Sequence, residues 1–111
     1  MGVLLKPAAL QILLALVDGD AHGYAILKTA RARAADQAPL RIASFYRHLA
    51  ALIREGLVAE LARPAGVDPR RGAYYRLTPA GRAVLVAERE RMAALVAQMR
   101  SLRPSSRKGT S

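Results

Sequence analysis

The chain has 111 residues, which is enough for one domain, and its core should be aliphatic because 52% of the residues are hydrophobic but only 5% are aromatic. Its 18 Lys and Arg against 8 Asp and Glu give a net charge of +10, which favours a polyanionic partner, either nucleic acid or an anionic membrane surface. The absence of cysteine excludes disulfides, thiolate metal sites and thiol catalysis.

The first predicted helix covers about residues 7–17. Proline fits its first position, because the missing N–H of Pro7 would have no helical partner there. The predicted inner face consists of Leu10, Leu13, Leu14 and Val17, widened by Ile12 and Leu16. This apolar run is too short to span a bilayer, so we interpret it as a core helix of a cytoplasmic protein with no membrane segment.

A second helix is predicted to begin near His22 and to continue to about residue 35. Pro39 should end it, since proline disfavours helical backbone in the residue before it. The predicted inner face is shallow and contains Tyr24, Leu27, Ala30 and Ala34. Three basic residues should be exposed to solvent: Lys28, Arg31 and Arg33.

Residues 42–55 have the spacing of an amphipathic helix that ends at Gly56. The predicted inner face contains Ile42, Phe45, Leu49, Leu52 and Ile53. The opposite face is small or cationic and carries Ser44, Arg47, Ala51 and Arg54. Three helices with short connections, the third presenting a basic face, form a helix-turn-helix arrangement, although this stretch by itself could equally be an ordinary solvated helix.

After Gly56 the apolar period changes. Residues 57–62 and 73–77 are typical of two short strands, and the segment between them is rich in turn residues and carries Arg63, Arg70 and Arg71. Two strands joined by a basic loop behind a recognition-type helix predict a β-hairpin wing. The predicted fold is therefore mainly α with a small β-hairpin, a winged helix-turn-helix domain over residues 1–78.

The last predicted helix starts with Thr78 as N-cap and Pro79 at the first helical position. We expect it to run to about Leu102 and assign residues 79–103 as a C-terminal dimerisation helix. Its apolar seam, which Glu88 interrupts, consists of Leu85, Met92, Leu95, Met99 and Leu102. The alternative is that the helix folds back on the first helix. Residues 104–111 are expected to form a disordered basic tail.

Three blocks of this sequence resemble the PadR-like winged-helix transcriptional regulators. His22-Gly23-Tyr24 is similar to the family's His-Gly-Tyr at the start of its second helix. Residues 44–57 resemble its recognition-helix pattern, and residues 68–71 with 74–82 resemble its wing. The resemblance covers about residues 5–90. It implies a DNA-binding regulator in which Tyr24 and Tyr46 anchor the protein to the DNA backbone.

The chain departs from the family pattern around the recognition helix. Arg41, Ile42 and Ala43 replace the usual Ser, variable residue and Gly, so the helix start should be capped differently. Ala50 and Ala51 replace a basic pair, which removes charge from the groove-facing surface. The resemblance therefore implies DNA binding without implying an operator preference.

The resemblance and the helix geometry together place Ser44, Arg47 and His48 where they can reach base edges or phosphates. The complete predicted DNA-binding set is Tyr24, Lys28, Arg41, Ser44, Tyr46, Arg47, His48, Arg63, Arg70, Arg71 and Tyr75. The competing interpretations are a packed helix-start aromatic for Tyr24 and simple solvation for the wing arginines. His22 and His48 are expected to be cap or surface residues, so no metal site and no cofactor are predicted.

No nucleophile in the sequence has a convincing base beside it, so we predict that the protein is not an enzyme. The leading hypothesis is a homodimeric, sequence-specific repressor that binds a palindromic operator in double-stranded DNA and is associated with the nucleoid when bound. The alternatives are a protein-interaction module and a non-specific nucleic-acid-binding module. A small-molecule effector would remain unidentified, and without Trp an aromatic-walled effector pocket at the dimer seam is not expected.

Overall fold

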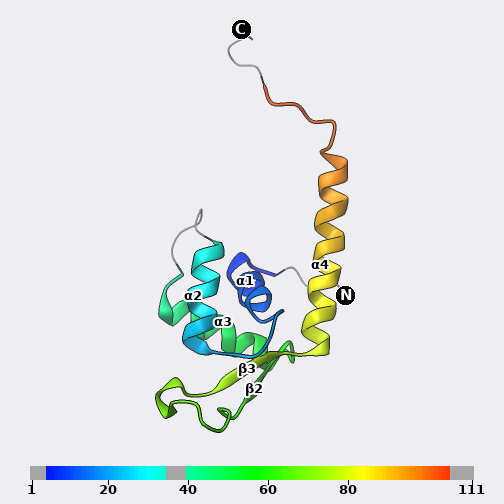
Figure 1. Ribbon diagram of the computed structural model, residues 1–111. Coiled ribbons are helices and arrows are strands. Elements are labelled where there is room, and N and C mark those ends of the chain that lie inside the picture. Colours follow the sequence, from blue (N-terminus) through cyan, green and yellow to red (C-terminus); the bar gives the residue numbers. More distant parts are fainter. Residues whose placement is uncertain (1–4, 35–39, 106–111) are drawn as a thin grey trace.

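The computed structural model describes residues 5–34 and 40–105. Figure 1 shows a group of packed helices beside a small sheet, while the last helix leaves the domain and projects well beyond it. The expected fold class is confirmed, because the described residues form four helices and a small antiparallel sheet. In chain order the elements are α1 (Pro7–Ala15), β1 (Ala21–His22), α2 (Gly23–Arg33), α3 (Ile42–Arg54), β2 (Val58–Leu61), the 3₁₀ turn η1 (Pro69–Arg71), β3 (Tyr74–Leu77) and α4 (Pro79–Gln98).

The core lies between α1, α2, α3 and the sheet and is almost wholly aliphatic. α1 packs against both α2 and α3, and α3 in turn contacts β2. Burial of each large side chain of this kind contributes about 1.5–3 kcal/mol, so this cluster supplies the main stabilisation of the domain. Its largest fully buried members are Ile12, Leu13, Ile26, Phe45, Leu49 and Val58.

The inner faces of the helices are partly different from those expected. In α2 the prediction for Tyr24 is wrong: its side chain is 62% exposed, and Ile26 is buried instead. In α3 the prediction for Ile42 is wrong as well, with 56% of the residue exposed. Both residues lie in the first turn of a helix, beyond the edge of the core, where helical spacing alone does not ensure burial.

The small sheet has three strands in the order β1-β3-β2, with both pairings antiparallel. The hairpin of β2 and β3 was expected from the sequence, whereas β1 was not. β1 has only two residues, and it pairs Ala21 with Tyr75 and His22 with Tyr74. Since β1 runs directly into α2, this pairing fixes the start of α2 beside the wing.

The root of α4 is fixed by Thr78, as the sequence predicts. Its hydroxyl accepts a hydrogen bond from the Gly81 amide at 3.0 Å and donates one to the Gly56 carbonyl at 2.7 Å. A Cβ atom at position 81 would overlap the Leu57 carbonyl oxygen, so only glycine allows α4 to approach the chain this closely. The N-cap therefore joins α4 to the turn that follows α3.

The two halves of α4 have different surroundings. The first half packs against α1 and β3, and Leu85 lies partly buried against the domain core. Glu88 is 5% exposed and forms two hydrogen bonds with the Arg91 guanidinium, at 2.7 and 3.0 Å. Beyond it, Met92 and Leu95 are 39% and 41% exposed. The back-folding alternative therefore describes the first half, and the second half projects away from the other described elements (Figure 1).

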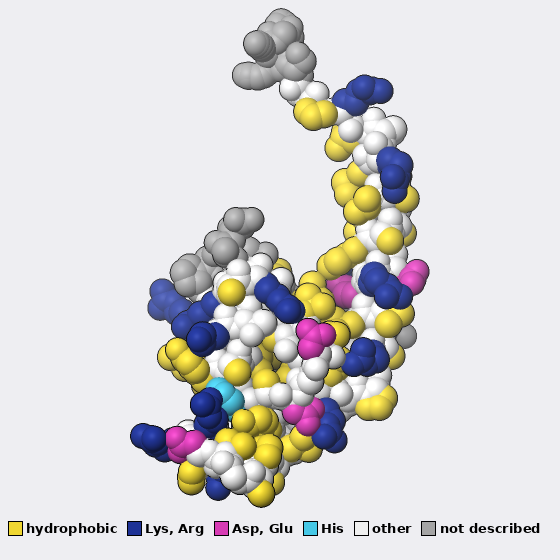
Figure 2. Space-filling view, in the orientation of Figure 1, with side chains coloured by type: hydrophobic (Ala, Val, Ile, Leu, Met, Phe, Trp, Pro, Cys, Tyr) yellow, Lys and Arg dark blue, Asp and Glu magenta, His cyan; other side chains and the backbone are white. Residues whose placement is uncertain are grey.

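α4 ends earlier than expected, because Gln98 is its last residue and a turn follows. Met99 and Leu102 lie beyond the helix and are 53% and 73% exposed. Figure 2 shows apolar side chains along the projecting arm, on the side that faces the domain. Two predicted segments lie outside the described residues: the end of the second helix, at residues 35–39, and most of the basic tail, at residues 106–111.

Among residues 5–34 and 40–105, no helix combines the length and apolar character needed to cross a membrane. The same residues contain no group of three or more His, Asp or Glu side chains arranged to hold a metal ion.

Candidate nucleic-acid interface

The outer face of α3 carries short and cationic side chains. Arg47 is exposed, and its guanidinium donates a hydrogen bond to the Ser44 hydroxyl at 3.2 Å, which holds the two side chains together on the surface. Arg41 is the N-cap residue of α3, but its side chain makes no capping hydrogen bond and is exposed. Ala50 is exposed further along, so this face leaves the helix backbone open to close approach.

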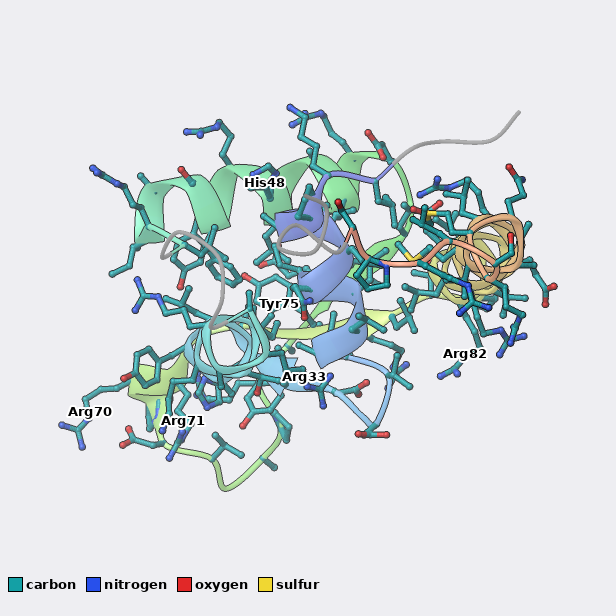
Figure 3. All side chains as sticks on the ribbon, turned by 90° about the horizontal axis from the view of Figure 1, so that it is seen from above. Arg33, His48, Arg70, Arg71, Tyr75 and Arg82 are labelled. Atoms are coloured by element: carbon teal, nitrogen blue, oxygen red, sulfur yellow. The ribbon has the colours of Figure 1, made fainter. Side chains whose placement is uncertain are left out.

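His48 lies apart from the wing arginines, on the edge of α3 that faces the start of α1 (Figure 3). It is half-buried and lines a hollow of about 220 Å³ together with Lys6 and Glu55. Burial lowers the pKa of His48, and the positive charges of Arg47 and Lys6 lower it further. The imidazole is therefore favoured in its neutral form, in which it can donate one hydrogen bond and accept another.

Tyr46 connects α3 with the start of α2. Its ring packs edge-on against Phe45, with the ring centroids 4.8 Å apart, and the residue is 47% exposed. A Cβ atom at Gly23 would come within 2.9 Å of the Tyr46 hydroxyl, so glycine at the first position of α2 leaves room for this oxygen. The ring is thus held by the core while the hydroxyl reaches the surface.

Tyr24 and Lys28 lie one turn apart on the exposed side of α2. The Lys28 ammonium is 5.9 Å from the centroid of the Tyr24 ring, which is within the range of a cation–π contact. Neither side chain belongs to the core. Together they extend the cationic surface from α2 towards the wing, and Figure 2 shows Lys and Arg side chains gathered over this part of the molecule.

The wing tip is shaped by Asp68. Its carboxylate accepts a hydrogen bond from the Arg70 amide at 3.0 Å, which caps η1, and forms an ion pair with the Arg70 guanidinium at 3.0 Å. These hydrogen bonds lower the pKa of Asp68. Gly72 ends the turn with a φ of +70°, a conformation that favours glycine. Figure 3 shows Arg70 pointing away from the body of the molecule, whereas Arg71 lies on the side of the turn nearer α2, where its guanidinium contacts His22.

One cleft of about 520 Å³ lies where the starts of α2 and α3 meet the wing. It brings together five of the residues predicted to bind DNA, namely Tyr24, Tyr46, Arg70, Arg71 and Tyr75. Tyr75 is half-buried, and burial, followed by the charge of Glu60, raises the pKa of its phenol. Arg63 lies outside this cleft, beside a separate open hollow next to Glu60 and Ala62.

His22 is a member of the cleft that the sequence-based DNA-binding set omits. Its Nδ1 atom lies 3.3 Å from the Ala25 amide nitrogen as an N-cap of α2, and its Nε2 atom lies 2.7 Å from the Arg71 guanidinium. Its ring also packs edge-on against Tyr74. Burial lowers the pKa of His22, and the charge of Arg71 adds to this effect. His22 is the N-cap residue of α2, as expected, and its contact with Arg71 depends on the β1–β3 pairing.

Several arginines hold the fold together. Arg31 donates to the Leu40 carbonyl at 2.9 Å and so joins α2 to the segment before α3. Arg33 donates to the Leu14 carbonyl at 3.2 Å, and Arg76 forms a two-pronged ion pair with Asp20 at 2.8 and 3.1 Å. Part of the excess positive charge therefore has a structural role, while Arg47 and Arg70 are exposed on the surface and Arg71 contacts His22 in the cleft.

The model of the transcriptional regulator PadR-like family matches residues 12–87. The chain belongs to this family. The matched segment runs from the end of α1 to the first half of α4 and includes the whole cleft. PadR-family regulators are DNA-binding proteins of transcription regulation, and typically they are not enzymes. No curated protein matches the sequence.

Solved structures share the fold. A PadR family transcription regulator from Clostridium difficile R20291 is 22% identical, with a TM-score of 0.72 over 86% of this chain and 96% of that one. A transcriptional regulator from Clostridium thermocellum is 24% identical, with a TM-score of 0.68 over 86% and 92%. BpsR from Bordetella bronchiseptica, whose DNA binding is regulated by 6-hydroxynicotinic acid, is 26% identical, with a TM-score of 0.62 over 96% and 74%.

Proposed function

We propose that this PadR-family protein is a sequence-specific repressor that binds double-stranded DNA as a dimer. The observation that carries the proposal is the cleft in which Tyr46 of α3 meets Arg70 and Arg71 of the wing. Because the recognition helix and the wing border the same cleft, a DNA backbone following it would have hydroxyl and guanidinium donors on both sides. Such phosphate contacts fix the register from which α3 can read base edges.

In this proposal the residues of α3 have different tasks. Arg47 reads guanine or grips an adjacent phosphate, since its guanidinium can form two parallel hydrogen bonds with either. Ser44 lies on the same surface and can contact a neighbouring base. His48 would contact a base edge or a phosphate from the edge of α3 that faces α1. Among the remaining members of the predicted set, Tyr24 adds a phosphate contact from within the cleft, and Lys28 and Arg41 add contacts beside it. Arg63 would contact DNA on the other side of the wing.

The test compares two arginine variants that change the net charge equally. Arg47→Ala should weaken binding to the upstream region of its own gene by about 1–3 kcal/mol, roughly 5- to 150-fold, because it removes one base or phosphate contact. Arg89→Ala is the matched control, since Arg89 is exposed on α4 in a surface pair with Glu90. Fluorescence anisotropy against excess bulk DNA measures both. Equal losses in the two variants would contradict a reading role for α3, and no preference over bulk DNA would favour the non-specific module.

We further propose that the second half of α4 joins two copies of the chain. Support comes from the apolar side chains exposed there, Met92, Leu95 and Val96, and from Met99 directly after the helix. One recognition helix reads only a few base pairs, which is too little to select one site in a genome. Two copies related by a two-fold axis would read half-sites about 34–36 Å apart, as a palindromic operator requires.

Leu95→Glu tests this assembly, because it places a charge on the exposed apolar side of α4, away from the winged domain. We expect a folded monomer in sedimentation analysis, with residual non-specific DNA binding and no operator preference. Ala97→Glu is the control: it adds the same charge two residues away, on the opposite face of α4, and should leave the dimer intact. A Leu95→Glu variant that still sediments as a dimer, or a monomer that protects a palindrome, would refute the assignment.

A further inference from the structure

The imidazole of His22 has two neighbours that compete for it. The Ala25 amide, 3.3 Å from Nδ1, and the Arg71 guanidinium, 2.7 Å from Nε2, are both hydrogen-bond donors. A neutral imidazole has one acceptor nitrogen and one N–H, and an arginine cannot give up its proton. His22 can therefore satisfy only one of the two donors at a time.

We infer that the shorter contact, the one to Arg71, is the one satisfied in the free protein. If Nε2 carried the proton, two N–H groups would face each other across 2.7 Å beside a full positive charge. The proton therefore belongs on Nδ1, with Nε2 accepting from Arg71. The Ala25 amide of α2 then faces the protonated Nδ1 of His22, so α2 loses its capping acceptor. The contact with Arg71 and the cap of α2 are alternatives.

We propose that His22 is itself a contact to the nucleic-acid backbone, which exchanges Arg71 for a phosphate oxygen when DNA enters the cleft. The inference deepens the proposed function and rests on it. A phosphate attracts the exposed Arg71 away from Nε2, because an anion is a much stronger acceptor for guanidinium than a neutral imidazole. The proton of His22 then moves to Nε2, where it is donated to the phosphate, and Nδ1 becomes free to cap α2.

The groups around His22 decide the charge that it experiences. The wing presents Asp68, Arg70 and Arg71, and the tyrosines of the other elements complete the cleft: Tyr24 from α2, Tyr46 from α3, and Tyr74 and Tyr75 from β3. Without DNA, burial and Arg71 lower the pKa of His22. A bound phosphate offsets the charge of Arg71, so the pKa of His22 must be higher in the complex than in the free protein. Binding is then coupled to proton uptake, and affinity rises as the pH falls from the pKa of His22 in the complex to its lower pKa in the free protein.

The tautomer of His22 provides a direct test in the intact chain. Imidazole ¹⁵N NMR of the free protein should show the proton on Nδ1, and Arg71→Ala, which removes the competing donor, should move it to Nε2. Adding a short duplex of arbitrary sequence at low salt should produce the same Nε2–H form, or the imidazolium at low pH, because phosphate contacts do not depend on sequence. A free protein with the proton already on Nε2 would overturn the proposal.

The duplex titration also separates this proposal from the proposed function. If the duplex binds and His22 keeps its proton on Nδ1, the exchange is refuted while DNA binding stands. If the duplex does not bind at all, both the phosphate contact and the proposed function are refuted.

A second measurement uses His22→Asn. Asparagine is an effective N-cap, so α2 keeps its cap, but the variant has no titratable donor at the position of Nε2. Affinity for the duplex should fall by about 2- to 10-fold, the value of one net hydrogen bond. The pH dependence of binding should also become shallower than in the wild-type protein. Any titration of His48 affects binding equally in the two proteins and cancels in the comparison. Identical affinities and identical pH profiles would overturn the proposal.

Discussion

Thr78 carries two hydrogen bonds on one hydroxyl, and its replacement by alanine should be costly. The change removes the acceptor of the Gly81 amide, 3.0 Å away, and the donor to the Gly56 carbonyl, 2.7 Å away. Loss of an N-cap costs about 0.5–2 kcal/mol, and loss of a further net hydrogen bond about 0.5–1.5 kcal/mol. We therefore expect Thr78→Ala to lower the free energy of unfolding by about 1–3.5 kcal/mol.

Urea unfolding followed by far-ultraviolet circular dichroism measures this loss as a shift of the midpoint with an unchanged slope. All variants must be compared at one protein concentration, since self-association would change the apparent stability. Thr78→Ser keeps the hydroxyl and should stay within about 0.5 kcal/mol of the wild type. An alanine variant as stable as the wild type, or a serine variant as unstable as alanine, would refute the role of the hydroxyl at the root of α4.

Two further predictions concern ionic interactions. Replacing Arg70 and Arg71 together by Ala should weaken specific and bulk DNA binding alike, and the slope of log K against log salt should fall by roughly two units if both contact phosphates; an unchanged slope would mean that the wing stays solvated. Glu88→Gln should destabilise the protein at neutral pH, because the hydrogen bonds from Arg91 lower the pKa of Glu88. That contribution is present above the pKa of an unfolded Glu, about 4.3, and is lost as the pH falls through the lower pKa of the folded state, so urea midpoints of the two proteins should converge in acid.

Local rules predicted the elements that are long and strongly patterned. Phe45, Leu49 and Leu52 recur with helical spacing and are all buried in α3, and the Thr78-Pro79 pair marks the start of α4 correctly. β1 escaped prediction because a two-residue strand has no period of its own and exists only through its pairing with β3. The end of α4 was also misjudged, since the apolar spacing continues through Leu102 after the helix has stopped.

The sequence predicted several residues of the cleft but not the cleft itself. The resemblance identified Tyr24, Tyr46 and the wing arginines one block at a time, and nothing in their spacing showed that they share one cleft. His22 and Arg71 are 49 positions apart, and their contact requires the register that sets His22 opposite Tyr74. The sequence did identify His22 as part of the His-Gly-Tyr block. Because it was interpreted only as a cap or surface residue, the contact of its Nε2 atom with Arg71 was not predicted.

The arrangement of the tyrosines has an optical consequence. Tyr24, Tyr46 and Tyr75 line the cleft, and Tyr74, the fourth tyrosine of the chain, packs against His22 at its edge. Because the chain contains no Trp, its intrinsic fluorescence originates almost entirely from this one corner of the molecule. Stacking or hydrogen bonding by a ligand in the cleft would quench that emission without any attached dye, whereas α4, which has no aromatic residue, would associate without a direct change in the signal.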